Sequence, residues 1–248
     1  MARSSIGRAL HTAMVVLLLT VAAARAQQPD SATVELGPWL VGINAGAVFP
    51  MATSLSGKGA VGGLNVSAAG DLNFRPGSTF TAFTSYELND YVAFAGQLGY
   101  ATTQFDNFQG TLSLTDVGSL TSKFAVSGHS DIVYGFVDTI IRPLGGSRTA
   151  RFVPFIGAGI GFASSTTTFG SVGLPGGTLP IGITSRDTNL AAVGILGADY
   201  RITERAYLGV AYQFVRANGG TFGGGSGFSG QTGALRVNIV SALFEYRF

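Results

Sequence analysis

The chain of 248 residues has few charges and many glycines: only 11% of its residues are charged, against roughly 25% in ordinary soluble domains, and 37 are glycine. It contains no cysteine, which excludes disulfides and a lipid anchor attached through an N-terminal cysteine. The formal net charge of +2 is small and gives no reason to expect a nucleic-acid partner.

The N-terminal segment has the three parts of a secretory signal peptide. Arg3 and Arg8 supply the positive start, residues 13–24 are apolar, and Ala24-Arg25-Ala26 forms a cleavage site. A membrane-spanning helix needs about 20 apolar residues, more than this run provides. Removing the segment takes away three of the 15 basic residues and leaves the 13 acidic ones, so the basic balance belongs to targeting. The predicted organisation is a signal peptide (1–26), a short periplasmic N-terminal segment (27–38) and a folded domain (39–248).

Apolar residues alternate with small or polar residues along most of the remaining chain, which is the pattern of β-strands with two different faces. In residues 39–49 the apolar face begins with Trp39 and ends with Phe49, as in strands with aromatic residues at both membrane interfaces. In residues 152–163 the second face includes Gly157, Gly159 and Gly161, which suits a crowded interior. Eight strands are predicted, at 39–49, 78–88, 91–105, 130–142, 152–163, 189–201, 206–216 and 235–248.

Two of these strands are less regular. Asp138 is in register with the apolar residues of 130–142, so either that face points inward or a bulge shifts the register. In the last strand, Val237 and Ile239 are apolar in the opposite register to Phe244 and Phe248. This change of register predicts a bulge or switch at 238–241.

The connectors between the predicted strands alternate between long and short. The short ones are 89–90, 143–151 and 202–205, and the long ones are 50–77, 106–129, 164–188 and 217–234. This alternation is typical of an antiparallel up-and-down transmembrane β-barrel with short periplasmic turns and long outer loops. We expect the long connectors, rich in Gly, Ser and Thr, to be mobile surface loops, and leave open whether the first contains an extra hairpin. A soluble exported β-sandwich is the alternative fold.

Several segments resemble the small outer-membrane β-barrel family, with its OmpX-like, OmpA-transmembrane-domain-like and opacity-like porin-family members. They are the signal peptide and residues 151–162, 206–214 and 244–248. The resemblance implies an all-β, eight-stranded barrel in the bacterial outer membrane with periplasmic termini. It also implies that the terminal aromatic residues form an assembly signal for the barrel-insertion machinery: Phe244, Tyr246 and Phe248.

Charged residues gather at the predicted periplasmic ends of the strands: Glu87, Asp138, Arg142, Asp199, Arg201, Glu245 and Arg247. They indicate either an ion-conducting mouth or a network of ion pairs that fills the lumen. We favour the network, because an eight-stranded barrel is just wide enough for its own side chains. The glycine-rich runs do not begin a helix after a strand, so they are not phosphate loops. No metal or cofactor site is expected.

His129-Ser130-Asp131 is the one cluster that suggests nucleophilic catalysis, as in a lipid hydrolase. Neighbouring residues of a strand point to opposite faces, so His129 and Ser130 should diverge, and we do not expect an enzyme. The predicted role is structural or surface-interactive through the long loops, and a narrow channel for small or apolar solutes is the alternative. Expected partners are outer-membrane lipid and lipopolysaccharide, the assembly machinery and an extracellular ligand, with the protein as a monomer and no nucleic acid.

Overall fold

The computed structural model describes residues 37–61, 64–114, 118–145, 150–174, 177–224 and 228–248, so the predicted signal peptide lies outside the described residues. Eight antiparallel strands form a closed ring, as predicted. In ring order they are β1 (Trp39–Pro50), β4 (Gly77–Glu87), β5 (Val92–Leu114), β6 (Gly118–Ile141), β7 (Phe152–Leu174), β8 (Gly177–Arg201), β9 (Ala206–Ala217) and β12 (Leu235–Arg247). Within the described part of the chain, no helix has the length and apolar character needed to cross a membrane.

The first and last strands close the ring. β1 pairs with β12 from Leu40 opposite Arg247 to Pro50 opposite Val237, and its other edge pairs with β4. Every strand of the ring therefore has two neighbours, which leaves no free edge in this part of the barrel. A sandwich of two separate sheets does not fit this pairing, so the alternative fold is excluded.

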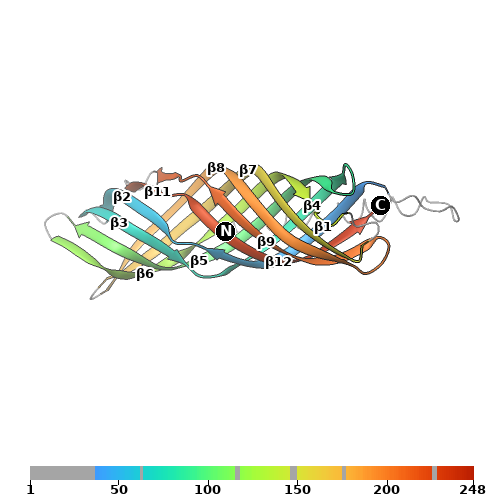
Figure 1. Cartoon of the computed structure of the whole chain (residues 1–248). Coiled ribbons are helices and arrows are strands. Elements are labelled where there is room, and N and C mark those ends of the chain that lie inside the picture. The colour runs from blue at the N-terminus through green and yellow to red at the C-terminus, as the bar shows by residue number, and fades with distance from the viewer. Residues whose placement is uncertain (1–36, 62–63, 115–117, 146–149, 175–176, 225–227) are drawn as a thin grey trace. The chain divides into compact units, whose positions relative to one another are not determined.

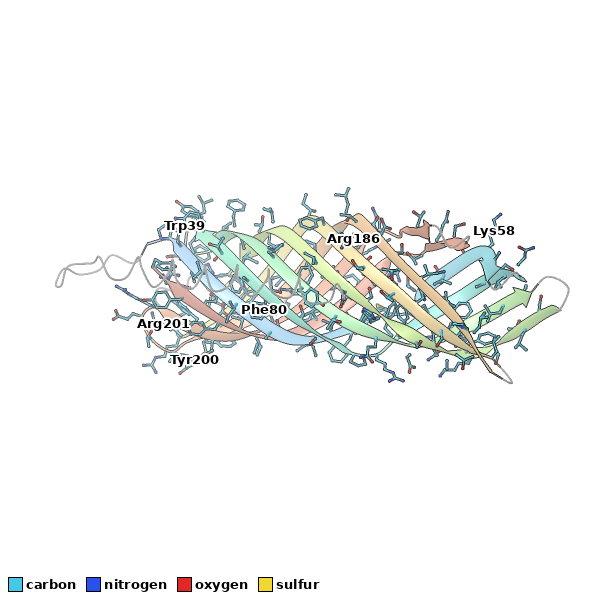
Figure 2. The ribbon with its side chains drawn as sticks, turned by 180° about the vertical axis from the view of Figure 1, so that it is seen from behind. Trp39, Lys58, Phe80, Arg186, Tyr200 and Arg201 are labelled. Carbon is cyan, nitrogen blue, oxygen red and sulfur yellow. The ribbon has the colours of Figure 1, made fainter. Side chains whose placement is uncertain are left out.

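The outer surface of the ring is apolar, and its aromatic residues mark the end that carries the short turns. Trp39 is half exposed and packs edge-on against Tyr86, with ring centroids 5.0 Å apart. Tyr200 is also exposed at this end, where Figure 2 shows it close to Arg201. Alternate residues point inward and are buried, so the two faces predicted from the alternating pattern are confirmed. This apolar band with an aromatic girdle is the surface that lipid contacts in a membrane barrel.

The long connectors are not loops, and this part of the prediction was wrong. β5 to β8 continue as strands through most of residues 106–129 and 164–188. The first long connector forms the hairpin left open above, β2 (Thr53–Val61) and β3 (Leu64–Phe74), and the last contains β10 (Thr221–Gly224) and β11 (Phe228–Thr232). We call β2, β3, β10, β11 and the far parts of β5–β8 the extension. Figure 1 shows β2, β3 and β11 together at the end of the barrel opposite the C-terminus.

Bulges interrupt the alternating pattern of β5 and β7 where the extension begins. The pairing of β5 with β6 shifts between Gln104 and Asn107, and that of β7 with β8 shifts between Phe169 and Ser171. A further shift follows Ser127 of β6. Across these shifts the buried positions change from odd to even residue numbers on β5 (Phe105 to Phe108) and on β7 (Phe169 to Val172), so a strict period of two ends there. β6 and β8 keep the same alternation throughout.

Unlike the ring below it, the extension is a sheet whose two outer strands, β10 and β8, each have an unpaired edge among the described residues, and the β6–β7 ladder within it begins only at Val126. Its order is β10-β11-β2-β3-β5-β6-β7-β8, and hydrogen-bonded pairing joins each neighbour to the next. The far part of β8 has no strand partner on its second side among the described residues, because its pairing with β9 begins only at Ala191. β10 contacts β8 without forming a described ladder with it. A seam therefore separates β8 from the β10–β11 hairpin.

The predicted bulge at 238–241 is absent, because β12 keeps one register with both neighbours throughout its length. Val237 and Ile239 are buried inside the barrel, whereas Val240 and Phe244 are exposed on the outer face. The lumen is apolar at this height, so the sequence can be apolar on both faces without a shift. The same reason applies to the strand with Asp138: its apolar face points inward and is buried.

Candidate functional site

The interior near the short turns contains most of the predicted charge network. Glu87 is the centre of an ion-pair group: Arg142 Nη1 lies 2.9 Å and Arg247 Nη2 lies 2.5 Å from its Oε1 atom. All three side chains are almost completely buried. One carboxylate between two guanidinium groups offsets much of the cost of removing these charges from water.

A small cavity of about 60 Å³ lies next to this group. Its lining includes Asp138, Arg142, Asp199 and Glu245, so four of the seven predicted network residues meet there. Asp138 accepts a hydrogen bond of 2.7 Å from Gln97 Nε2. Arg201 is half-buried, lies opposite Tyr207 in the β8–β9 ladder and is not part of the lining.

Interior glycines leave room for the buried carboxylates. A Cβ atom at Gly159 would collide with Asp138 Oδ1, and one at Gly209 would collide with Asp199 Oδ1. The glycine face of β7 predicted from the sequence therefore accommodates side chains from neighbouring strands. The arrangement fills the lumen with charge and hydrogen-bonding groups.

An apolar layer separates these charges from the extension. It includes Ile132, Phe136, Val193, Val215 and Ile239, all buried and in one hydrophobic cluster. Tyr134 belongs to the same cluster, and its hydroxyl lies 2.8 Å from Thr79 Oγ1 and 2.6 Å from Thr81 Oγ1. Water and ions are strongly disfavoured in such a layer.

His129 and Ser130 lie on opposite faces of β6. His129 Nε2 is 3.7 Å from Asp131 Oδ2, and Tyr100 donates a hydrogen bond of 2.8 Å to Asp131 Oδ1 on the same outer face. Ser130 is buried, with its Oγ atom 3.2 Å from Thr167 Oγ1. The histidine therefore has a carboxylate neighbour, but the adjacent serine is not within its reach.

The predicted assembly residues lie at the C-terminal end of β12, which closes the barrel against β1. Phe244 is exposed on the outer face, and the rings of Tyr246 and Phe248 are 5.5 Å apart in an edge-on contact. The Phe248 amide donates a hydrogen bond of 3.2 Å to the Trp39 carbonyl. Their role as an assembly signal stays a prediction.

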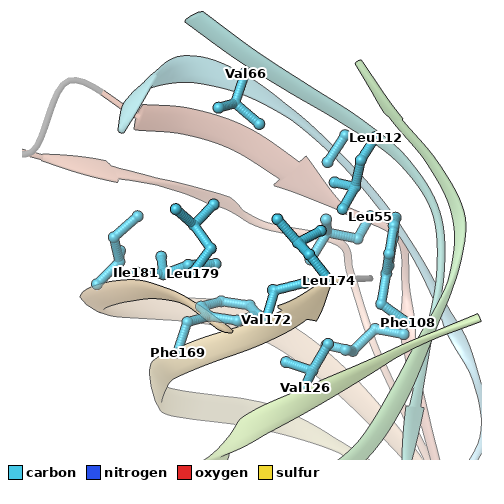
Figure 3. Close-up of a pocket in the computed structure, with 13 residues that line it drawn as sticks. Leu55, Val66, Phe108, Leu112, Val126, Phe169, Val172, Leu174, Leu179 and Ile181 are labelled. Atoms are coloured by element: carbon cyan, nitrogen blue, oxygen red, sulfur yellow. The ribbon is translucent and has the colours of Figure 1, made fainter. Parts of the chain in front are cut away.

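The extension contains an apolar chamber that the sequence interpretation missed. It has a volume of about 70 Å³, and all 13 lining residues are apolar. They come from β2, β3, β5, β6, β7 and β8, which surround the chamber in Figure 3. The available signal was the alternation of Leu179, Ile181 and Ile183 within a segment interpreted as a loop. The lining residues are Leu55, Val66, Ala68, Leu72, Phe108, Leu112, Val126, Phe169, Val172, Leu174, Leu179, Ile181 and Ile183.

A second, more open hollow lies on the same end of the barrel. It has a volume of about 870 Å³ and is lined by β2, β3, β8, β10 and β11. Most of its lining residues are serine, threonine, glycine or glutamine, and its two charged residues are Lys58 and Arg186. We call this hollow the basic groove.

Comparison with known proteins gives a family match over most of the chain. Residues 13–248 match the family model for the outer membrane protein beta-barrel domain. Neisserial surface protein A shares 16% identity at a TM-score of 0.45, over 86% of this chain and 98% of that one. OprG from Pseudomonas aeruginosa shares 15% identity at a TM-score of 0.45, over 86% and 97%. The outer membrane protease OmpT from Escherichia coli shares 11% identity at a TM-score of 0.43, over 89% and 99%. Among curated proteins, no sequence matches the chain.

Proposed function

The chain belongs to the outer membrane protein β-barrel domain family. We propose that it binds small apolar molecules in the chamber of its extension. The protein is located in the bacterial outer membrane. In barrels of this membrane the short turns face the periplasm, so the extension and its chamber face the cell exterior. An apolar solute outside the cell would reach the chamber before any other part of the interior.

The lining of the chamber is the observation that supports this proposal. Its 13 residues offer no side-chain donor or acceptor, and the space among them is not filled by protein. Apolar cavities of this kind stay dry and take up apolar ligands, which gain roughly 25 cal/mol for each Å² of apolar surface removed from water. The chamber is small, so the ligand is expected to insert a slender chain or one aromatic group into it.

The lower interior favours binding over passage of ions through the whole barrel. The apolar layer with Ile132 and Phe136 lies between the extension and the buried ion pairs of Glu87. An ion on this route would lose its water in the apolar layer and then meet a lumen filled by side chains. In place of a channel through the whole barrel, we therefore propose that apolar solutes bind in the extracellular chamber.

The proposed surface-interaction role would use the outer face of the extension. Paired hydroxyl groups follow the ladders there, such as Thr111 with Thr121 at 2.8 Å and Ser113 with Ser119 at 2.8 Å. Such a surface is polar and low in charge, which suits contact with saccharides, including the lipopolysaccharide expected as a neighbour. The apolar chamber is the more specific feature, so binding of small molecules remains the leading proposal.

Fluorescence of N-phenyl-1-naphthylamine tests the chamber, because this apolar dye brightens when it leaves water. The folded protein in amphipol should enhance the dye's fluorescence, and Ile181→Trp should lose most of the enhancement by filling the chamber. Leu190→Trp is the matched control, because Leu190 is exposed on β8 and does not line the chamber. Equal enhancement by Ile181→Trp and the unmodified protein, with both folded by gel mobility before and after boiling, would exclude the chamber as the binding site.

A further inference from the structure

The basic groove and the apolar chamber are neighbours built from the same strands. Ala68 of β3 lines both hollows. On β2, Leu55 lines the chamber and Lys58 lines the groove, and on β8 the corresponding residues are Ile183 and Arg186. One set of strands thus presents apolar side chains to the chamber and polar ones to the groove.

Among the described residues that line it, the groove has positively charged side chains and no carboxylate. Lys58 and Arg186 are exposed, and the other ten lining residues are uncharged. Figure 2 shows Lys58 near the tip of the extension and Arg186 closer to the middle of the barrel. Arg186 Nε donates a hydrogen bond of 3.3 Å to Thr166 Oγ1, and the guanidinium has further N–H donors available to a ligand.

The nearest acidic residue in sequence does not cancel this charge from within the groove. Asp187 follows Arg186 on β8, and successive side chains of a strand point to opposite faces. Asp187 lines an adjoining interior cavity, which shares Ser185 and Thr221 with the groove, and there it accepts a hydrogen bond of 3.1 Å from Asn189 Nδ2. The groove therefore favours negatively charged groups.

We propose that the ligand is an anionic amphiphile, with its apolar chain in the chamber and its acidic head group in the basic groove near Lys58 and Arg186. This inference rests on the proposed function and specifies the class of ligand. The shared residue Ala68 marks where the chain would pass from one hollow to the other. The hydroxyl groups of Ser56, Ser67 and Ser229 would supply hydrogen bonds to the head group.

The experiment compares an acid with its neutral ester on the same hydrocarbon chain. The fluorescent cis-parinaric acid and its methyl ester are titrated at pH 8 into the full protein in amphipol. The double variant Lys58→Gln, Arg186→Gln should weaken binding of the acid by about tenfold, as expected for loss of charge-assisted hydrogen bonds at exposed positions. It should leave binding of the ester unchanged. Lys123→Gln is the control, because Lys123 is exposed on β6 and lines neither hollow.

The two ligands separate failure of this inference from failure of the proposed function. If neither the acid nor the ester binds the unmodified protein, the proposed function itself is wrong. If both bind equally and the double variant changes neither, the chamber binds apolar molecules but the groove does not select an acidic head group. Competition by lipopolysaccharide that is lost in the double variant would identify an acylated anion of the membrane as the ligand, whereas competition by free decanoate alone would identify a soluble acid.

Discussion

Glu87 and Arg247 form an ion pair inside the barrel although 160 positions separate them in the sequence. Arg247 Nη2 donates a hydrogen bond of 2.5 Å to Glu87 Oε1, and Arg142 approaches the same oxygen. The pair joins β12 to β4, which lie on either side of β1 in the ring. The ion pair therefore links the last strand, β12, to β4 across β1, the strand against which the barrel closes.

Replacing Glu87 by Gln should destabilise the barrel by about 3–5 kcal/mol, because it leaves two buried guanidinium groups without their shared carboxylate. The measurement is urea unfolding in lipid vesicles, followed by the fluorescence of Trp39, the single tryptophan of the chain. Glu204→Gln is the matched control, since Glu204 is exposed in the turn after β8. An unfolding midpoint equal to that of the control would show that the ion pair contributes little.

Gly159 should tolerate no side chain, because a Cβ atom there would collide with the Asp138 carboxylate and with the carbonyl oxygen of Val137. Gly159→Ala is expected to lower the free energy of unfolding by about 1–3 kcal/mol, the usual cost of overpacking. Gly194→Ala is the control, since no atom lies within 4 Å of a Cβ added there. The same urea titration compares the two variants, and equal midpoints would mean that Asp138 moves aside without cost.

The ring of strands could be predicted because lipid and lumen impose opposite demands on alternate residues. The alternation in β1 placed Trp39 and Phe49 on one face and polar Asn44 on the other. In the structure both aromatic residues are exposed on the outer face and Asn44 is buried inside. The assumption that apolar residues face lipid failed in the last strand, where Val237 and Ile239 are buried in an apolar part of the lumen. An apolar side chain alone does not indicate whether lipid or protein surrounds it.

The chamber and the groove could not be predicted, because they depend on pairings between distant segments. Leu55 and Ile183 line one chamber only because β2 pairs with β3, and β3 with the far part of β5. The bulge after Gln104 exchanges the inward and outward positions of β5, so the alternating pattern in the sequence does not show that the strand continues. Low charge and abundant Gly, Ser and Thr then resembled a loop, although threonine also favours strands.

The extension should resist proteolysis, unlike the mobile loops that its composition suggested. Lys123 lies opposite Gln109 in the β5–β6 ladder, and Arg186 lies opposite Thr166 in the β7–β8 ladder. A protease must first unpair the strand around the bond that it cuts. At both positions the ladder with one neighbouring strand opposes this local opening, so cleavage should be slow. Trypsin added to intact cells is expected to leave both bonds uncut, as read by mass spectrometry of the recovered chain. The urea-unfolded protein is the control, and cleavage of the folded protein at either residue as rapid as in that control would contradict the strand assignment.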